Sequence, residues 1–248
     1  MNLFSTSAPG RLDVMGGIAD YSGSLLLQMP IAERTTLAMQ QRDDTVWNIA
    51  SKDLNGDEQF FSFDFTAHKN ISYTQLNKLL LQQHNGNWAV YVIGCFYVLQ
   101  KEKQIPLTGA EIYITSQIPL GKGVSSSAAV EVATICAYLQ MLHASLSEIQ
   151  IPLLAQMAEN FVVGAACGLM DQLSVYYGEA NKLLPLICQP HTVMPAVEIP
   201  AGIGFCGIDS GIRHAVSGAS YNDVRTAAFM GYSIIAQHCG ASADEPGP

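Results

Sequence analysis

The sequence has few charged residues, and most of the charges that it does carry are negative. Only 13% of its 248 residues are Asp, Glu, Lys or Arg, and the formal net charge is −9. Lysine and arginine form no run anywhere in the chain. Nucleic acids and anionic membranes bind basic surfaces, so we expect neither as a partner. An anionic ligand would therefore need a local site built from backbone amides and a few cations.

Long apolar runs and closely paired cysteines are also missing. The most apolar stretch, 88–99, is too short to span a bilayer, and no basic-then-apolar leader opens the chain. The scattered cysteines lie in apolar contexts, which is typical of reduced core residues. They are Cys95, Cys136, Cys167, Cys188, Cys206 and Cys239. We therefore expect a cytoplasmic protein, and the hydrophobic fraction of 49% indicates a compact globule of one large domain, or of one domain with part of a second.

The hydrophobic pattern predicts a mixture of strands and helices. Alternating or apolar runs predict strands at 2–7, 30–46, 47–65, 110–117, 183–187 and 204–208, with Asn55-Gly56 as a hairpin turn. Helices are expected at 88–99, 128–142 and 221–237, and another is expected to open at a capping box formed by Ser145 and Glu148. The turn-rich stretch 8–24 reads as an irregular loop, and the tail 240–248 as frayed.

The stretch 119–129, Pro-Leu-Gly-Lys-Gly-Val-Ser-Ser-Ser-Ala-Ala, joins a predicted strand to a predicted helix. Gly121 and Gly123 allow close backbone approach, and the free amides of the helix start attract an anion. The serines that follow add hydroxyl donors, or a ligand for a phosphate-bound Mg²⁺. A Walker-type loop needs Ser or Thr directly after Gly-Lys, whereas Lys122 here precedes Gly123. The alternative is a capped helix after a glycine turn.

Three further charged residues are candidates for a site. Arg11 and Asp20 lie in the polar stretch 8–24, where loop residues commonly carry function. Asp171 follows a run of small residues in an otherwise apolar setting. The alternatives are a surface arginine, a turn aspartate and a helix cap, respectively.

Taken together, the order of these motifs resembles that of the GHMP kinases, the family of galactokinase, homoserine kinase and mevalonate kinase. The glycine turn is similar to their signature Pro-x-x-x-Gly-Leu-Ser-Ser-Ser-Ala, with Val124 in place of leucine. The stretches 9–16, 167–172 and 210–221 resemble the motifs that surround the sugar in galactokinases. The resemblance extends over essentially the whole chain.

The resemblance implies an α+β fold with two domains. Residues 1–200 would form a domain like domain 2 of ribosomal protein S5, which binds sugar and ATP. Residues 201–248 would begin a ferredoxin-like C-terminal domain. The family's third motif, a late glycine-rich segment, is absent, so the chain would be a truncated relative that is possibly inactive alone. The deleted domain would leave an apolar face exposed, which predicts self-association.

The resemblance also implies roles for individual residues. Asp171 would be the catalytic carboxylate at the anomeric hydroxyl of a sugar, with Arg11 beside it. Asp20, Gly168, Tyr221 and Gly17 would contact the sugar, while Ser126 and Glu159 would hold Mg²⁺. The ATP phosphates would lie on Gly121, Lys122, Gly123, Val124, Ser125, Ser126, Ser127 and Ala128. The implied ligands are thus MgATP and a small sugar.

One departure from galactokinases bears on the choice of sugar. Galactokinases read Gly-Glu-His-Thr-Asp-Tyr where this chain has Gly-Gly-Ile-Ala-Asp-Tyr, so their sugar-binding glutamate is replaced by Gly17. That glutamate reaches the exocyclic hydroxymethyl group of galactose, which L-arabinopyranose lacks. The segment is also similar to that of plant-type L-arabinokinases. We therefore expect L-arabinose as the substrate, with D-galactose as the alternative substrate. The alternative function is a sugar-binding protein without turnover.

Overall fold

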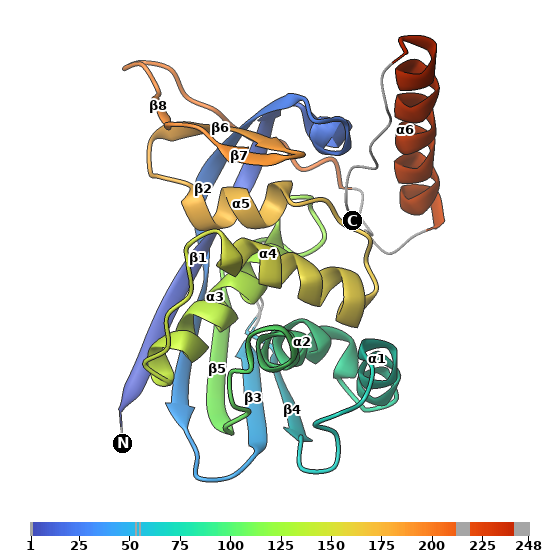
Figure 1. The fold of residues 1–248 in the computed structure, drawn as a ribbon. Coiled ribbons are helices and arrows are strands. Elements are labelled where there is room, and N and C mark those ends of the chain that lie inside the picture. The colour runs from blue at the N-terminus through green and yellow to red at the C-terminus, as the bar shows by residue number, and fades with distance from the viewer. Residues whose placement is uncertain (1, 53, 55, 212–218, 241–248) are drawn as a thin grey trace.

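The computed structural model describes residues 2–52, 54, 56–211 and 219–240, and its strands form an eight-stranded sheet (Figure 1). The strand order is β4-β3-β5-β2-β6-β7, with β1 paired to β2 and β8 paired to β6. The strands are β1 Leu3–Met15, β2 Leu25–Gln41, β3 Val46–Lys52, β4 Glu58–Asp64, β5 Ala110–Ser116, β6 Lys182–Cys188, β7 His191–Val193 and β8 Val197–Glu198.

The long strand β2 organises the sheet. Along one edge it pairs antiparallel with β1, from Leu3 opposite Gln40 to Met15 opposite Leu27. Along its other edge the C-terminal half pairs with β5 and the N-terminal half with β6. Only β3 and β5 are parallel among the described pairs. Because β2 pairs with β1 and also with β5, it holds the glycine turn that follows β5 close to β1.

Helices cover one face of this sheet, as Figure 1 shows. They are α1 Tyr73–Leu81, α2 Gly86–Lys103, α3 Ser126–Met141, α4 Gln150–Met157, its π-helical continuation η2 Ala158–Val163, and α5 Met170–Tyr177. The short 3-10 helix η1 Gly17–Ser22 joins β1 to β2, and α6 Ala219–His238 stands outside the layer near η1. Within the described residues, no helix is both long and apolar enough to cross a membrane.

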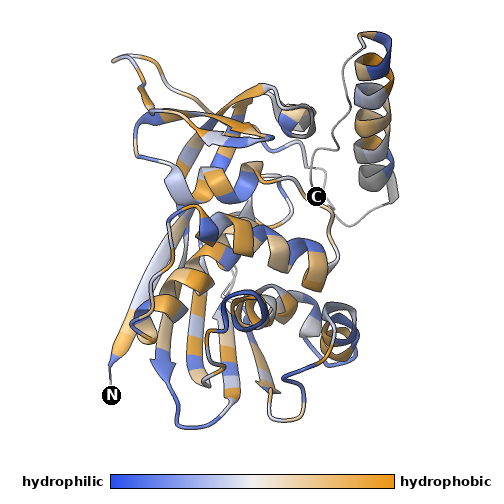
Figure 2. Ribbon diagram, viewed as in Figure 1, coloured by the Kyte–Doolittle hydropathy of each residue, from blue (hydrophilic) through white to orange (hydrophobic). Residues whose placement is uncertain are grey.

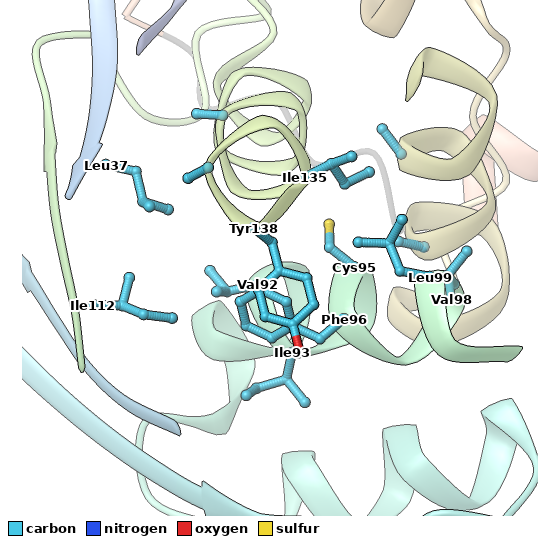
Figure 3. Packing of buried hydrophobic residues seen from close by; sticks show 14 of the residues in the cluster. Leu37, Val92, Ile93, Cys95, Phe96, Val98, Leu99, Ile112, Ile135 and Tyr138 are labelled. Carbon is cyan, nitrogen blue, oxygen red and sulfur yellow. The ribbon is translucent and has the colours of Figure 1, made fainter. Parts of the chain in front are cut away.

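The core lies between the sheet and the two central helices α2 and α3. Alternate strand residues such as Trp47, Ile49 and Ile112 are buried, and hydropathy alternates accordingly along the strands (Figure 2). They meet α2 and α3, which are apolar nearly all round and therefore suited to full burial. Phe96 and Tyr138 are completely buried, and their ring centroids are 4.7 Å apart (Figure 3).

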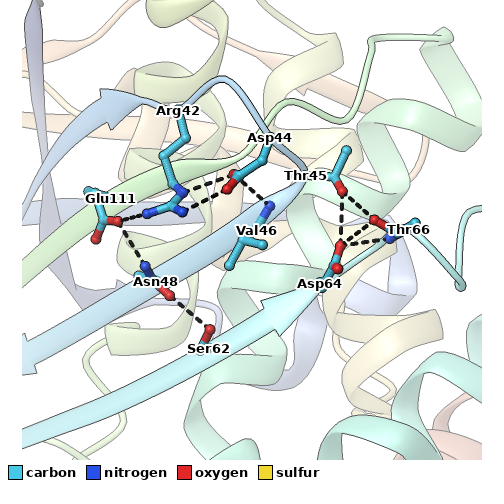
Figure 4. A network of polar contacts seen from close by, with 9 residues as sticks. All are labelled: Arg42, Asp44, Thr45, Val46, Asn48, Ser62, Asp64, Thr66 and Glu111. Atoms are coloured by element: carbon cyan, nitrogen blue, oxygen red, sulfur yellow. Dashed lines mark hydrogen bonds and ion pairs between the residues drawn. The ribbon is translucent and has the colours of Figure 1, made fainter.

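The opposite face of the sheet is exposed, and around β3 and β5 it carries a network of polar side chains. Arg42 makes ion pairs with Asp44, at 2.7 Å, and with Glu111 of β5 (Figure 4). Asn48 of β3 donates a hydrogen bond of 2.8 Å to Glu111. Since these residues alternate with the buried ones along β3 and β5, the sheet has one face for the core and one for solvent. The structure thus confirms the mixed α and β fold.

Several sequence predictions are confirmed. The buried helix at 88–99 lies within α2, the helix at 128–142 corresponds to α3, and that at 221–237 lies within α6. The strand at 2–7 is part of the edge strand β1, and the hairpin between β3 and β4 forms. Asn55 of its predicted turn, the stretch 212–218 and most of the tail lie outside the described residues.

Other predictions are wrong. The stretch 8–24 is not a loop in its first half, because β1 runs on to Met15 and pairs with β2 through two irregularities in register. The capping box at 145–148 does not form, since α4 begins at Gln150, and the Ser147 N–H instead bonds the Gln150 side chain at 3.2 Å. Residues 204–208 form no strand. Cys206 and Cys239 are exposed rather than part of the core.

Candidate active site at the glycine turn

The turn between β5 and α3 has the backbone of an anion-binding loop. Gly121, Gly123 and Ser125 all have positive φ, between 61° and 69°. A side chain on Gly123 would meet nothing within 4 Å, so the turn faces open space. Ser125 precedes α3 without capping it, and its buried hydroxyl has no hydrogen-bond partner within the described residues. The amides at the start of α3 are therefore left for a ligand.

Arg11 joins this turn to Asp171. Its Nε and Nη2 atoms donate to Asp171 Oδ1 at 3.0 and 2.5 Å, and its Nη1 donates to the Gly123 carbonyl at 2.7 Å. The Arg11 residue is only 8% exposed. The carboxylate at the start of α5 is thus held beside the glycine turn, as the sequence motifs predicted.

A glycine in β1 permits this approach. The Arg11 backbone N–H donates to the Val124 carbonyl at 3.1 Å, so β1 lies directly against the turn. A Cβ atom on Gly10 would lie 2.8 Å from that carbonyl and 2.9 Å from the Ile31 side chain. Any side chain at position 10 would therefore push the strand away from the turn.

Behind Asp171 lies a buried cluster in which the side-chain amide of Gln172 joins two carboxyl groups, those of Glu159 and Glu131. Gln172 Nε2 donates to Glu159 Oε2 at 2.7 Å and to Glu131 Oε2 at 3.3 Å. Burial, and next the charge of Asp171, raise the pKa of Glu159 to about 7, while hydrogen bonds from Ser127, Cys167 and Gln172 oppose this rise. Burial also raises the pKa of Glu131 well above its ordinary value, and the charge of Glu159 adds to it.

Of the two predicted metal residues, Glu159 belongs to this cluster. Glu159 is 3% exposed and lies in η2, the π-helical turn that ends α4. The hydroxyl that hydrogen-bonds it is that of Ser127, whereas the sequence motif pointed to the neighbouring Ser126. Both serines lie in the first turn of α3. A hydroxyl and a carboxylate are oxygen ligands of the kind that Mg²⁺ takes.

Lys122 of the turn has a protein partner. Its Nζ atom lies 2.9 Å from Asp209 Oδ2, in the exposed segment 199–211. This segment, β1, β2 and the turn enclose a cavity of about 900 Å³, lined by Arg11, Asp13, Lys122 and Gly123 among others. An anion on the turn would compete with Asp209 for the lysine.

The predicted sugar residues are only partly placed. Asp20 lies in η1 and is 5% exposed. Burial raises the pKa of the Cys188 thiol, and the charges of Asp20 and Asp171 raise it further. Gly17 begins η1 with φ 36°, and Gly168 lies three residues before Asp171. Tyr221 lies in α6, but its side chain is outside the described residues.

Sequence reasoning missed Glu131, Gln172 and Asp13. Glu131 interrupts an apolar helical run, a signal that would have marked it. Asp13 is held by Gln28, whose Nε2 donates to Asp13 Oδ1 at 2.7 Å. Its other carboxylate oxygen, Oδ2, lies 3.1 Å from where a Cβ atom on Gly17 would lie. No pattern in the sequence indicates this proximity, because it depends on the fold.

Known sequences resemble this chain along most of its length. Residues 90–179 match the family model described as the GHMP kinases N terminal domain. L-arabinokinase of Arabidopsis thaliana is 41% identical over 261 aligned positions, covering 94% of this chain and 25% of that protein. Galactokinase of Chloroflexus aggregans is 32% identical, covering 88% of this chain and 52% of that protein. The chain thus spans between a quarter and about half of the length of these relatives.

Solved structures agree with this fold. The galactokinase of Lactococcus lactis complexed with galactose superposes with a TM-score of 0.76 at 20% identity, covering 98% of this chain and 59% of that one. The mevalonate kinase of Methanococcus jannaschii gives a TM-score of 0.59 at 19% identity, covering 81% and 56%. The matched family model, the related sequences and the shared fold lead to one conclusion: residues 90–179 match the GHMP kinases N terminal domain, and the chain as a whole is similar in sequence and fold to kinases of that family.

Proposed function

We propose that this chain forms the sugar- and nucleotide-binding part of a kinase that phosphorylates the anomeric hydroxyl of L-arabinose. The observation that carries the proposal is the double contact of Arg11, which bonds both Asp171 and the Gly123 carbonyl. A phosphate on the glycine turn and a hydroxyl at Asp171 would then be neighbours. Such alignment of two reactants supplies a large part of the rate acceleration in phosphoryl transfer.

The residues divide the reaction between them. The anomeric oxygen would form a bond to the terminal phosphorus of ATP while the bond from that phosphorus to the bridging oxygen of ADP breaks. Asp171 would accept the hydroxyl proton or orient the hydroxyl, and a positioned base is worth about 10²–10⁴-fold. Arg11 would hold the Asp171 carboxylate in place and offset charge on the transferring group, and the amides at the start of α3 would bind phosphate oxygens.

The residues at the buried cluster fit a magnesium ion. Glu159 offers carboxylate oxygens, and Ser126 and Ser127 in the first turn of α3 offer hydroxyl oxygens. A buried carboxyl group whose pKa is raised to about 7 gains stability in its ionised form when a cation binds it. Mg²⁺ bound there with ATP would neutralise phosphate charge. Ser126 and Glu159 remain our proposed ligands.

Two observations favour L-arabinose over D-galactose. Identity is 41% to a protein named L-arabinokinase and 32% to the galactokinase of Chloroflexus aggregans. Position 17 is a glycine with φ 36°, a conformation strained for a glutamate, so the side chain that galactokinases use for the hydroxymethyl group has no equivalent there. L-arabinopyranose has the ring configuration of galactose without that group. D-galactose is the second candidate substrate.

The test is ADP release from MgATP by the chain with L-arabinose, with D-galactose and without sugar. We expect sugar-dependent release that is fastest with L-arabinose, and a loss of about 10²-fold or more in Asp171→Asn. The matched control is Asp43→Asn, an exposed aspartate in the turn between β2 and β3. Sugar binding by calorimetry without ADP release would instead support a non-catalytic sugar-binding protein. If neither sugar binds nor stimulates release, the proposal fails.

A further inference from the structure

Asp13 lies on the same face of β1 as Arg11, two residues away. Successive side chains of a strand alternate, and the register of β1 with β2 is regular from Arg11 to Asp13. Both residues line the cavity that also borders Lys122 and Gly123 of the turn. Asp13 is exposed, while Arg11 is buried against Asp171. An aspartate therefore faces the cavity next to the pair that would hold the reacting hydroxyl.

The Asp13 carboxylate has a fixed direction. Gln28, its cross-strand neighbour on β2, is completely buried and donates from Nε2 to Asp13 Oδ1 at 2.7 Å. The second oxygen, Oδ2, points to Gly17, because it lies 3.1 Å from where a Cβ atom on that glycine would be. One oxygen is thus engaged by the sheet, and the other lies in the space that the missing side chain leaves beside η1.

We infer that Asp13 binds a hydroxyl on the side of the sugar ring opposite the anomeric carbon, and thereby determines which sugar is accepted. This inference rests on the proposed function. Residues two apart in a strand are about 6.6 Å apart along it, a spacing similar to the width of a pyranose with its hydroxyls. A ring whose anomeric hydroxyl meets Asp171 beside Arg11 would present its far side to Asp13. A fixed carboxylate is a strong acceptor for hydroxyl groups.

The same geometry discriminates between a pentose and a hexose. A hexopyranose carries an additional hydroxymethyl group on the ring carbon next to the one that lies opposite the anomeric carbon, and the Asp13 carboxylate already occupies the space beside Gly17. A pentose fits without displacing the carboxylate from Gln28. Shortening the side chain to alanine would remove a hydrogen bond from the pentose and give room to the hexose. Asp13→Ala should therefore change the selectivity between the two sugars, whereas a loss of fold would weaken the binding of both sugars to the same extent.

The experiment measures dissociation constants of L-arabinose and D-galactose by calorimetry for the full chain, Asp13→Ala and Asp13→Asn. For Asp13→Ala we expect the preference for L-arabinose to fall by about tenfold or more, since lost hydrogen bonds to charged groups have that size. Asp13→Asn keeps the volume and an acceptor for Gln28, so it should fold normally and bind L-arabinose about tenfold more weakly. The control, Asp43→Ala, removes an exposed aspartate outside the cavity and should change neither constant.

The outcomes separate this inference from the proposed function. If the unmodified chain binds sugar and both Asp13 variants keep its affinities and preference within about twofold, Asp13 is not a specificity residue, although the proposed function stands. If Asp13→Ala does not fold, the folded Asp13→Asn variant decides in the same way. If the unmodified chain binds neither sugar, the proposed function fails and this inference fails with it.

Discussion

Replacing Glu159 by glutamine should make the metal-free chain less sensitive to pH. Glu159 is 3% exposed, and burial together with the nearby charge of Asp171 raises its pKa from 4.5 to about 7. Between these two values the folded protein holds a proton on Glu159 that the unfolded chain has released. The free energy of unfolding therefore decreases as pH rises through this window. The stabilisation is complete below about pH 4.5 and is lost above about pH 7.

The magnitude follows from the difference between the two pKa values. One pKa unit corresponds to about 1.36 kcal/mol, so a change from 4.5 to about 7 is equivalent to about 3 kcal/mol in total. Most of it falls between about pH 5 and about pH 8. Glutamine cannot ionise, and its side-chain oxygen can still accept the hydrogen bond from Gln172. Any pH-independent loss of stability caused by the substitution cancels, because the difference in the free energy of unfolding between the two proteins is compared at two pH values.

The assay is urea unfolding in the presence of a chelator, followed by the fluorescence of the tryptophans, of which Trp47 is fully buried. We expect the stability of Glu159→Gln relative to the unmodified chain to rise by about 2–3 kcal/mol between about pH 5 and pH 8. The exposed Glu148 provides a matched control, Glu148→Gln, which should follow the unmodified chain. In Glu159→Gln the pKa of Glu131 also loses the contribution of the Glu159 charge, which changes the pH dependence of the variant in the same direction. Parallel curves for Glu159→Gln and the unmodified chain would refute the reasoning.

Two further predictions concern single contacts. Asp209→Asn frees Lys122 from its exposed ion pair, so a fluorescent ATP analogue should bind up to about fivefold more tightly. Adding Lys122→Ala should abolish this gain. An unchanged affinity would show that Lys122 does not meet the phosphates. Tyr138→Phe leaves the buried Thr108 N–H and Pro106 carbonyl without the hydroxyl at 2.8 and 2.7 Å, which should cost about 1–3 kcal/mol in urea unfolding, whereas Tyr113→Phe on the exposed face should cost little. Equal losses in the two variants would contradict this assignment.

The glycine turn was predictable because its signals are local. Gly121, Gly123 and the serines that follow fix the backbone within a few residues, and an apolar helix and an alternating strand flank them. The same holds for α2, whose length and apolar composition suffice to indicate a buried helix. For the stretch 8–24, however, local signals misled. Pro9 and Gly10 are turn residues by propensity, yet pairing of Pro9 and Arg11 with β2, on either side of a register shift at Gly10, keeps this stretch in a strand.

The contacts that make the site depend on residues far apart in the chain, and no local pattern contains them. Gly10 shows why: as a residue it suggests a turn, but its function is to let β1 approach the Val124 carbonyl, more than a hundred residues later. Arg11 can reach both Asp171 and Gly123 only because of that approach. Gly17 alone suggested a carboxylate lost from the sugar pocket, whereas the fold supplies one beside it from Asp13. The sequence around Gly17 therefore indicates a position without a carboxylate, whereas in the structure the Asp13 carboxylate of β1 lies beside that position.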